Sequence, residues 1–167
     1  MSDDTEMDEA VTALAAEVLQ AALARGDLIA TAESCTGGLV AGALTAIPGS
    51  SNVFDRGFVT YSNAAKSQML GVPFWMIEKH GAVSEEVARS MAGGALTHSD
   101  ATVAVAITGI AGPGGGIDDK PVGLVHFAAG RRETPIEHMR IEFGDLGRAE
   151  IRRRSVTQAL EMLRGFL

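Results

Sequence analysis

Ser34 and Lys66 are the two residues whose types best suit them for a shared chemical task. Ser34 lies in the segment ESCTGG (residues 33–38), and Lys66 closes the segment TYSNAAK (residues 60–66). A lysine that is partly buried at a helix start has a lowered pKa, so its neutral amine can take a proton from a serine hydroxyl. Tyr61 in the same segment is placed to pass that proton or to orient the amine. On placement alone Lys66 is either a solvated surface lysine or such a base, and the second interpretation indicates a Ser-Lys hydrolase.

The segment ESCTGG allows other interpretations. Ser34 or Thr36 can cap the helix that follows, which is the commonest role of a hydroxyl residue at a helix start. Cys35 is intrinsically the stronger nucleophile, but a cysteine hydrolase needs a paired histidine, and no histidine lies in the site segments. Gly37 and Gly38 leave the backbone open to a ligand, and the N–H groups of this turn, at a helix N-terminus, suit a phosphate or an oxyanion.

A third candidate segment is TGIAGPGGG (residues 108–116). Thr108 offers a hydroxyl group at the end of a predicted strand, and the glycines that follow, including Gly112, Gly114 and Gly115, suit a backbone cradle for a phosphate or a ribose. The spacing matches neither a P-loop nor a dinucleotide fingerprint.

Arg148 and Arg152 share one face of a predicted helix, where they are either a phosphate clamp or part of a solvated basic surface.

The elements that must position these segments alternate between helix and strand. The sequence predicts helices at residues 5–25, 37–46, 62–70, 73–79, 84–98 and 147–167, and strands at 28–32, 54–61, 101–108, 122–129 and 136–143. This order favours a single domain (residues 1–167) of the α/β class, a three-layer α/β/α sandwich around a mixed, mainly parallel sheet whose last two strands are antiparallel. The three candidate segments each follow a strand, so we expect them at one edge of the sheet.

Composition excludes several classes of protein. A net charge of −7 argues against non-specific binding to nucleic acid or to an anionic membrane surface. One cysteine rules out an internal disulfide, and the four histidines have no ligand spacing, so no metal site is expected. With neither a signal peptide nor a membrane span, a cytoplasmic protein is expected. The apolar first helix and faces of small residues favour a homodimer.

Seven motifs together resemble a known family. They occur in the order AESCTGG, PGSS..F, YSNAAK, LGV, GAVSEEVA..MA, ITGIAGPGGG and KPVGLV. This series resembles the C-terminal domain of the competence/damage-inducible CinA family, which also occurs as stand-alone nicotinamide-nucleotide amidohydrolases. The resemblance covers residues 10–163. The larger family members carry a further N-terminal domain with pyrophosphatase activity, which we do not expect in this chain.

The resemblance implies a reaction and its residues. Family enzymes hydrolyse the carboxamide of nicotinamide mononucleotide to nicotinate mononucleotide and ammonia, in pyridine-nucleotide recycling, with no metal or organic cofactor. By position, Ser34 is the implied nucleophile, Lys66, Tyr61 and Thr108 are further catalytic residues, and Arg148 binds the substrate. The family usually reads G-D-R before the last helix, whereas this chain reads GDLGR. The alternative is a non-catalytic nucleotide-binding or regulatory module.

Overall fold

Alternating valine and alanine residues build the centre of the sheet. β3 (Val103–Gly109) is buried along nearly its whole length, as its apolar sequence VAVAITG predicts. β1 (Ile29–Glu33) and β4 (Leu124–Arg131) flank it, and β2 (Phe54–Val59) and β5 (Glu137–Glu142) form the edges. Strands β2, β1 and β3 run parallel, whereas β4 and β5 pair antiparallel. The predicted mixed sheet with an antiparallel C-terminal part is therefore confirmed.

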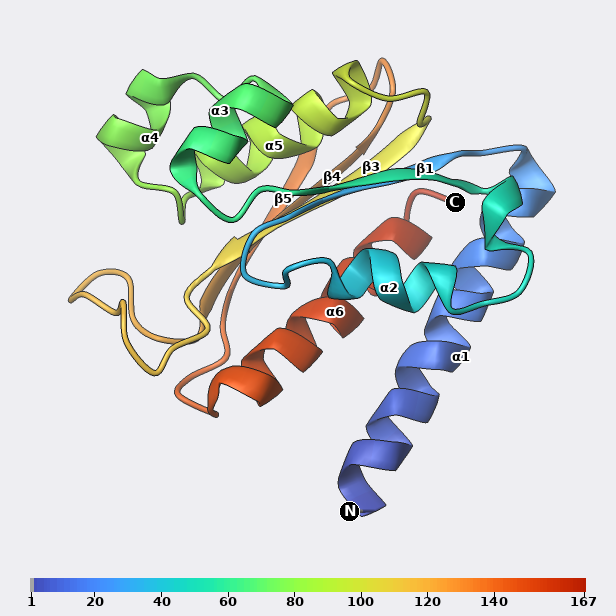
Figure 1. Cartoon of the computed structure of the whole chain (residues 1–167), viewed down its shortest axis with the longest axis horizontal. Helices are drawn as coiled ribbons and strands as arrows, with labels where there is room; N and C mark the ends of the chain where they lie inside the picture. The colour runs from blue at the N-terminus through green and yellow to red at the C-terminus, as the bar shows by residue number, and fades with distance from the viewer. Residues whose placement is uncertain (1) are drawn as a thin grey trace.

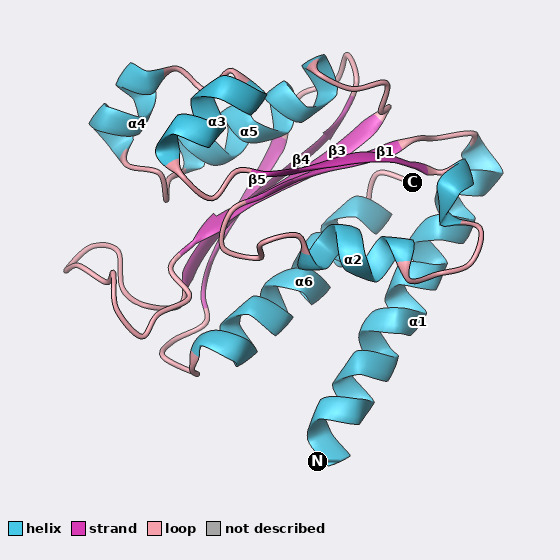
Figure 2. Ribbon diagram, in the orientation of Figure 1, coloured by secondary structure: helices cyan, strands magenta, loops and turns pink. Residues whose placement is uncertain are grey.

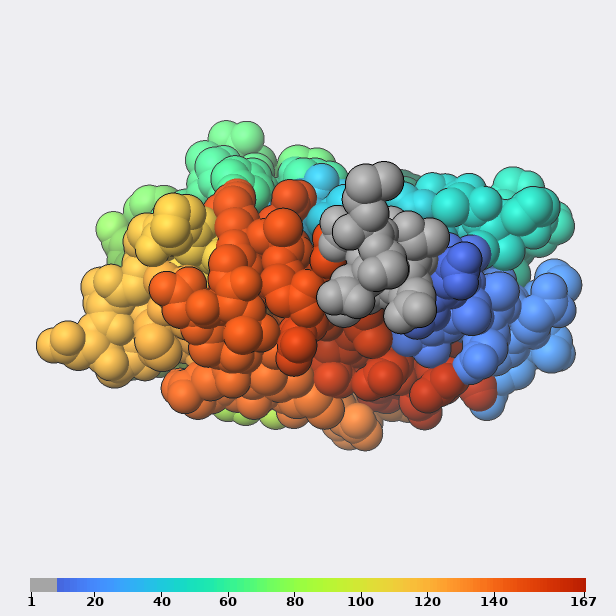
Figure 3. Space-filling model, turned by 90° about the horizontal axis from the view of Figure 1, so that it is seen from below, coloured from blue at the N-terminus to red at the C-terminus, as the bar shows by residue number. Residues whose placement is uncertain are grey.

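Helices cover both faces of this sheet in the computed structural model, which describes the backbone from Ser2 and the side chains from Glu9 to Leu167. On one face lie α1 (Ser2–Arg25), α2 (Leu39–Thr45) and α6 (Arg148–Arg164), and on the other α3 (Asn63–Leu70), α4 (Phe74–His80) and α5 (Glu85–Thr97) (Figures 1 and 2). Figure 3 views the first of these layers, with α6 in orange to red beside α1 in blue. None of the helices in the described part of the chain is both long and apolar enough to cross a bilayer.

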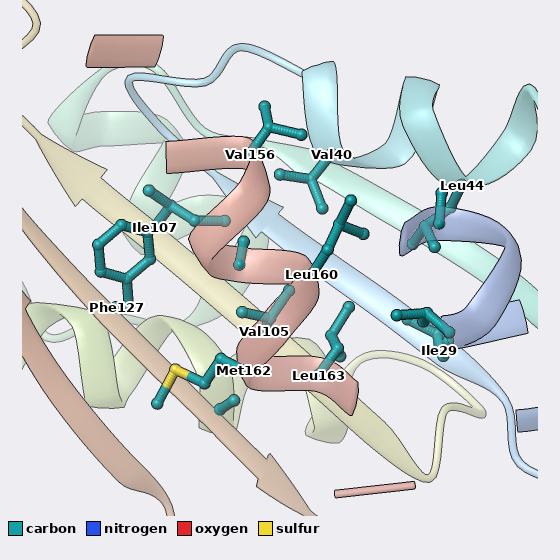
Figure 4. Close-up of a cluster of buried hydrophobic side chains, with 14 of the residues drawn as sticks. Ile29, Val40, Leu44, Val105, Ile107, Phe127, Val156, Leu160, Met162 and Leu163 are labelled. Atoms are coloured by element: carbon teal, nitrogen blue, oxygen red, sulfur yellow. The ribbon is translucent and has the colours of Figure 1, made fainter. Parts of the chain in front are cut away.

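The two faces of the sheet carry side chains of different size. Val105 and Ile107 of β3 pack with Phe127 and with Leu160 and Leu163 of α6 in the larger core (Figure 4). The opposite face presents alanines of β1, β3 and β4 to α5. Small side chains at this face allow close packing, and Gly94 of α5 likewise packs against α3, where an added Cβ would collide with the carbonyl oxygen of Leu70. The core on this side is therefore built largely from alanine side chains.

Two serine side chains cap helices on the second face of the sheet. The Ser62 hydroxyl accepts a hydrogen bond of 3.0 Å from the Ala65 N–H, and the Ser84 hydroxyl accepts one of 3.3 Å from the Val87 N–H. Each therefore satisfies one of the N–H groups left unpaired at a helix start. Ser62 fixes the start of α3, the helix that carries Lys66.

A buried ion pair lies at the end of the sheet opposite the candidate segments, where β1 begins and β4 finishes. The Asp27 carboxylate accepts two hydrogen bonds of 2.7 Å from the Arg131 guanidinium and one of 2.8 Å from the Thr102 hydroxyl. Arg131 also donates to the carbonyl of Phe166, near the C-terminus. The hydrogen bonds from Arg131 lower the pKa of Asp27 below its ordinary 3.8, against the opposing effect of burial.

We expect Asp27→Asn to lower the free energy of unfolding by about 2–4 kcal/mol, because it leaves the Arg131 charge without its carboxylate. Urea unfolding near neutral pH measures the loss. The control is Asp100→Asn, which weakens an exposed ion pair with Arg56 and should cost about 1 kcal/mol or less. Because the folded-state pKa of Asp27 is lowered, its contribution is present above about pH 4 and is lost as the pH falls through the folded-state value. Equal losses in both variants would contradict this account.

Candidate active site

The carboxyl ends of the three parallel strands bring the candidate segments together. The N–H of Ser34 donates to the Ile107 carbonyl of β3 at 3.0 Å, and the N–H of Thr60 donates to the Glu33 carbonyl of β1 at 2.8 Å. These bonds extend the strand pairing by one residue beyond the named strands. The carboxyl ends of these strands therefore bring together Ser34, Thr60 and Thr108 at one end of the sheet, as the sequence predicted.

Ser34 and Lys66 are in direct contact. The Lys66 amine donates to the Ser34 hydroxyl oxygen at 3.0 Å and to the Thr60 carbonyl at 2.9 Å. Lys66 is the fourth residue of α3, and side chains on a helix lean toward its N-terminus, which directs this one toward the strand ends. The side chain is 1% exposed. This burial lowers the pKa of the Lys66 ammonium below its ordinary 10.5, so a larger fraction of the side chain is the neutral amine at a given pH.

A pocket of about 220 Å³ opens beside this pair. Its lining consists of Ser34, Cys35, Tyr61, Asn63, Lys66, Ala82, Val83, Thr108, Gly109, Ala111 and Arg148. Ala82 and Val83 were not predicted as site residues, because they lie between two helices rather than after a strand. The Thr108 hydroxyl holds this loop at the pocket by donating to the Ala82 carbonyl at 2.8 Å. The GAVS motif was the available sequence signal for it.

Tyr61 and Arg148 form one wall of the pocket. The Arg148 guanidinium donates to the Tyr61 hydroxyl oxygen at 2.8 Å and to the Gly112 carbonyl at 2.9 Å. Despite the longer GDLGR approach, Arg148 therefore reaches the pocket from the first position of α6. Tyr61 contacts this arginine, whereas the Lys66 amine contacts Ser34 directly. A proton transfer between Lys66 and Ser34 does not require Tyr61.

The helix that follows ESCTGG is capped by neither Ser34 nor Thr36. It begins at Leu39 rather than at Gly37, and the buried Glu33 carboxylate accepts hydrogen bonds from the N–H groups of residues 40 and 41, at 2.8 and 3.1 Å. The carboxylate also offsets the positive end of the helix dipole. The N-terminus of α2 is thus not available to an oxyanion, which corrects the expectation from sequence.

The turn itself leaves two N–H groups available. The Gly37 N–H donates to the Ser34 carbonyl at 3.0 Å, so it is already paired. Gly38 lines a different cavity, of about 420 Å³, between α1, α2 and α6. No other residue in the described part of the chain accepts from the N–H of Cys35 or of Thr36, and the Cys35 N–H interacts only with its own thiol, whose pKa it lowers. Cys35 lines the pocket beside Ser34, whereas the Thr36 side chain is buried and its hydroxyl has no partner within the described chain.

The glycine-rich segment is only partly at the site. Gly112 meets Arg148 through its carbonyl, and the pocket lining ends at Ala111. Gly114 and Gly115 lie farther along the loop between β3 and β4, which projects away from the sheet (Figure 1). A role for these two glycines in binding a phosphate stays a prediction.

The Cys35 thiol is buried, and burial raises its pKa to about 12. No histidine is found among the described residues that line the pocket. The thiol therefore has neither the acidity nor the base that a cysteine nucleophile needs. Within the described residues, no group of three or more His, Cys, Asp or Glu side chains is arranged to hold a metal ion.

Comparison with known proteins places these features in a family. The model of the CinA C-terminal domain matches residues 11–167. A putative competence-damage inducible protein of Symbiobacterium thermophilum is 49% identical, covering 99% of this chain and 39% of that protein. A CinA-like protein of Anaeromyxobacter sp. is 50% identical over 84% of this chain and 34% of its own length. The chain thus spans less than two fifths of either relative.

Solved structures of similar length also match. The competence/damage inducible protein CihA of Agrobacterium tumefaciens is 54% identical, with a TM-score of 0.91 over 93% of this chain and 94% of that chain. A CinA superfamily protein of Escherichia coli is 36% identical, with a TM-score of 0.88 over 93% and 90% of the two chains. The fold is shared with these proteins over nearly the whole of each chain.

Proposed function

Since the chain belongs to the CinA C-terminal domain family, we propose that it is an amidohydrolase that converts nicotinamide mononucleotide and water into nicotinate mononucleotide and ammonia. The observation that carries the proposal is the 3.0 Å contact between the Lys66 amine and the Ser34 hydroxyl oxygen. A buried amine with a lowered pKa beside a hydroxyl group is the arrangement of a Ser-Lys nucleophile. The choice of nicotinamide nucleotide as the substrate follows from the family resemblance.

The first half of the reaction forms an ester on Ser34. The neutral Lys66 amine takes the hydroxyl proton as the serine oxygen attacks the carboxamide carbon. The negative charge that develops on the carbonyl oxygen is stabilised by backbone N–H groups, for which those of Cys35 and Thr36 are available. The Lys66 ammonium then gives its proton to the amide nitrogen, the C–N bond breaks, and ammonia leaves.

The second half hydrolyses this ester. Lys66, now neutral again, takes a proton from water, and the resulting hydroxide attacks the acyl carbon through the same oxyanion geometry. The Lys66 proton returns to the Ser34 oxygen as the ester bond breaks. The carboxylic acid formed on the nucleotide gives its proton to the released ammonia. The products are the nicotinate carboxylate, an ammonium ion and the free enzyme, so every proton is accounted for without a metal or an organic cofactor.

The phosphate of the nucleotide needs a local cation on a chain whose net charge is −7. Arg148 at the pocket wall supplies one, because its two hydrogen bonds use two of the five donors of a guanidinium. Asn63 and Thr108 add polar groups from two further sides. The binding site is therefore a small polar pocket with one arginine at its rim.

Ammonia release from nicotinamide mononucleotide by the purified chain tests the proposal. The panel includes nicotinamide riboside, which lacks the phosphate, and free nicotinamide, and we expect the mononucleotide to be turned over fastest. Saturable binding of the mononucleotide without ammonia release would instead support the non-catalytic module. If only a different amide is hydrolysed, the proposed reaction type stands and the proposed substrate is wrong.

We expect Cys35→Ala to retain turnover within about threefold of wild type, because a group outside the reaction contributes little to the activation free energy. Its backbone N–H, which is the part assigned to the oxyanion, remains in this variant. Steady-state ammonia release measures the effect. A loss comparable to that of a nucleophile variant would restore the cysteine-hydrolase interpretation.

A further inference from the structure

Arg152 of α6 holds the turn that follows Ser34. Its guanidinium donates to the Cys35 carbonyl at 3.1 Å and to the Thr36 carbonyl at 3.3 Å. The neighbouring arginines on the helix behave differently, since Arg153 and Arg154 both donate to Glu150. Arg152 lies about four residues after Arg148 on α6 and contacts the carbonyl groups of the turn that follows Ser34.

The contact with the Cys35 carbonyl sets the direction of a peptide group that the reaction uses. In a planar trans peptide the carbonyl and the N–H point in opposite directions. When the Cys35 carbonyl points to Arg152, the N–H of Thr36 points away from α6. The neighbouring peptide is fixed in the same way by the turn, because the Ser34 carbonyl accepts from Gly37 and the Cys35 N–H points away from it.

The guanidinium also lies close against the turn. Gly37 has a φ of +57°, and an added Cβ there would lie 3.3 Å from an Arg152 terminal nitrogen. A positive charge at this distance stabilises negative charge on the turn, and among its effects is a lowering of the pKa of the Cys35 thiol, against the larger effect of burial. Lysine would not reproduce the contact, because a guanidinium spans two acceptors in one rigid plane.

We propose that Arg152 is a positioning residue for catalysis: by holding the Cys35 carbonyl it directs the Thr36 N–H, which together with the Cys35 N–H fixed by the turn forms the oxyanion site beside Ser34. The inference rests on the covalent Ser34 chemistry proposed above. Arg152 does not touch the substrate in this scheme and acts only through the backbone. Its removal should therefore lower the rate of the chemical step and leave substrate affinity nearly unchanged.

The experiment compares wild type, Arg152→Ala, Arg152→Lys and the control Arg154→Ala, which loses an exposed partner of Glu150 on the same helix. Two rates are measured: ammonia release, and covalent labelling of Ser34 by a fluorophosphonate. We expect Arg152→Ala to lose about 10²-fold in kcat and in labelling rate, as expected for a disturbed oxyanion site, with KM within about threefold. Arg154→Ala should keep both rates, and Arg152→Lys should recover little.

Chemical rescue separates positioning from simple destabilisation. Millimolar guanidinium, far below denaturing concentrations, should restore several-fold of the labelling rate in Arg152→Ala and have no effect on Arg154→Ala. Methylammonium should not restore it. Should Arg152→Ala fail to fold, Arg152→Lys takes its place, with a loss of labelling expected at an unchanged melting temperature. Wild-type labelling in a folded Arg152 variant, or a loss of rate without rescue by guanidinium, overturns the proposal.

The labelling assay also keeps this proposal separate from the choice of substrate. The fluorophosphonate reports an activated serine and its oxyanion site whatever the natural amide is. If wild type is labelled at Ser34 but releases no ammonia from the nucleotide, the proposed substrate fails, and the role of Arg152 is still decided by the labelling rates.

Discussion

Replacing Ser34 with alanine is expected to lower the rate of ammonia release by about 10⁴-fold or more, because no second nucleophile is placed to take over. The Lys66 amine loses one hydrogen-bond partner but keeps the Thr60 carbonyl, so the fold should persist. Binding of the nucleotide should remain, since Arg148 and the other pocket walls are unchanged. Steady-state kinetics with calorimetric binding to the same variant measure both effects.

The matched control for this variant is Ser67→Ala, one residue beyond Lys66 in α3. The Ser67 hydroxyl is buried and has no partner within the described residues, so its removal deletes the same atom without a contact at the site. Turnover in this variant should be close to that of wild type. Near-normal turnover in Ser34→Ala would eliminate the serine mechanism, and a comparable loss in both variants would point to a general effect on folding.

The layers of the fold were accessible from sequence because each element carries a local signal. The run ATVAVAIT has the apolar character of a central strand. Serine residues stand directly before α3 and α5, which they cap, at Ser62 and Ser84. The parallel strands then require that their carboxyl ends share one edge. That requirement brings Ser34 near Lys66, although the two residues lie in different elements.

What the sequence did not predict depends on side-chain direction. The sequence around Glu33 does not predict that its carboxylate caps α2. The N–H groups that it accepts from lie seven and eight residues later in the chain, and this separation is not a standard capping motif. Arg148 and Arg152 share a helix face, yet one contacts Tyr61 and the other the Cys35 carbonyl. Such choices are set by packing between distant segments, which periodicity does not describe.

Replacing Lys66 with methionine should lower turnover by about 10³–10⁵-fold, because the general base of both half-reactions is removed. The methionine side chain has a similar length and suits a buried position. The folded state should change little in stability, since the cost of desolvating a buried amine is removed while the Thr60 carbonyl loses its donor. The control is Lys79→Met, which removes an exposed lysine of α4 and should change neither activity nor stability.

The dependence on pH links the two effects of this lysine. Only the neutral amine can take the Ser34 proton, so the labelling rate of wild type should rise with pH and level off at an inflection below 10.5, the ordinary lysine value. Between the lowered folded-state pKa and 10.5 the unfolded chain binds more protons than the folded one, so stability should also rise with pH in that window. Lys66→Met should lack both changes. If the inflection in labelling persists in Lys66→Met, another group is the base, and the buried lysine serves only the structure.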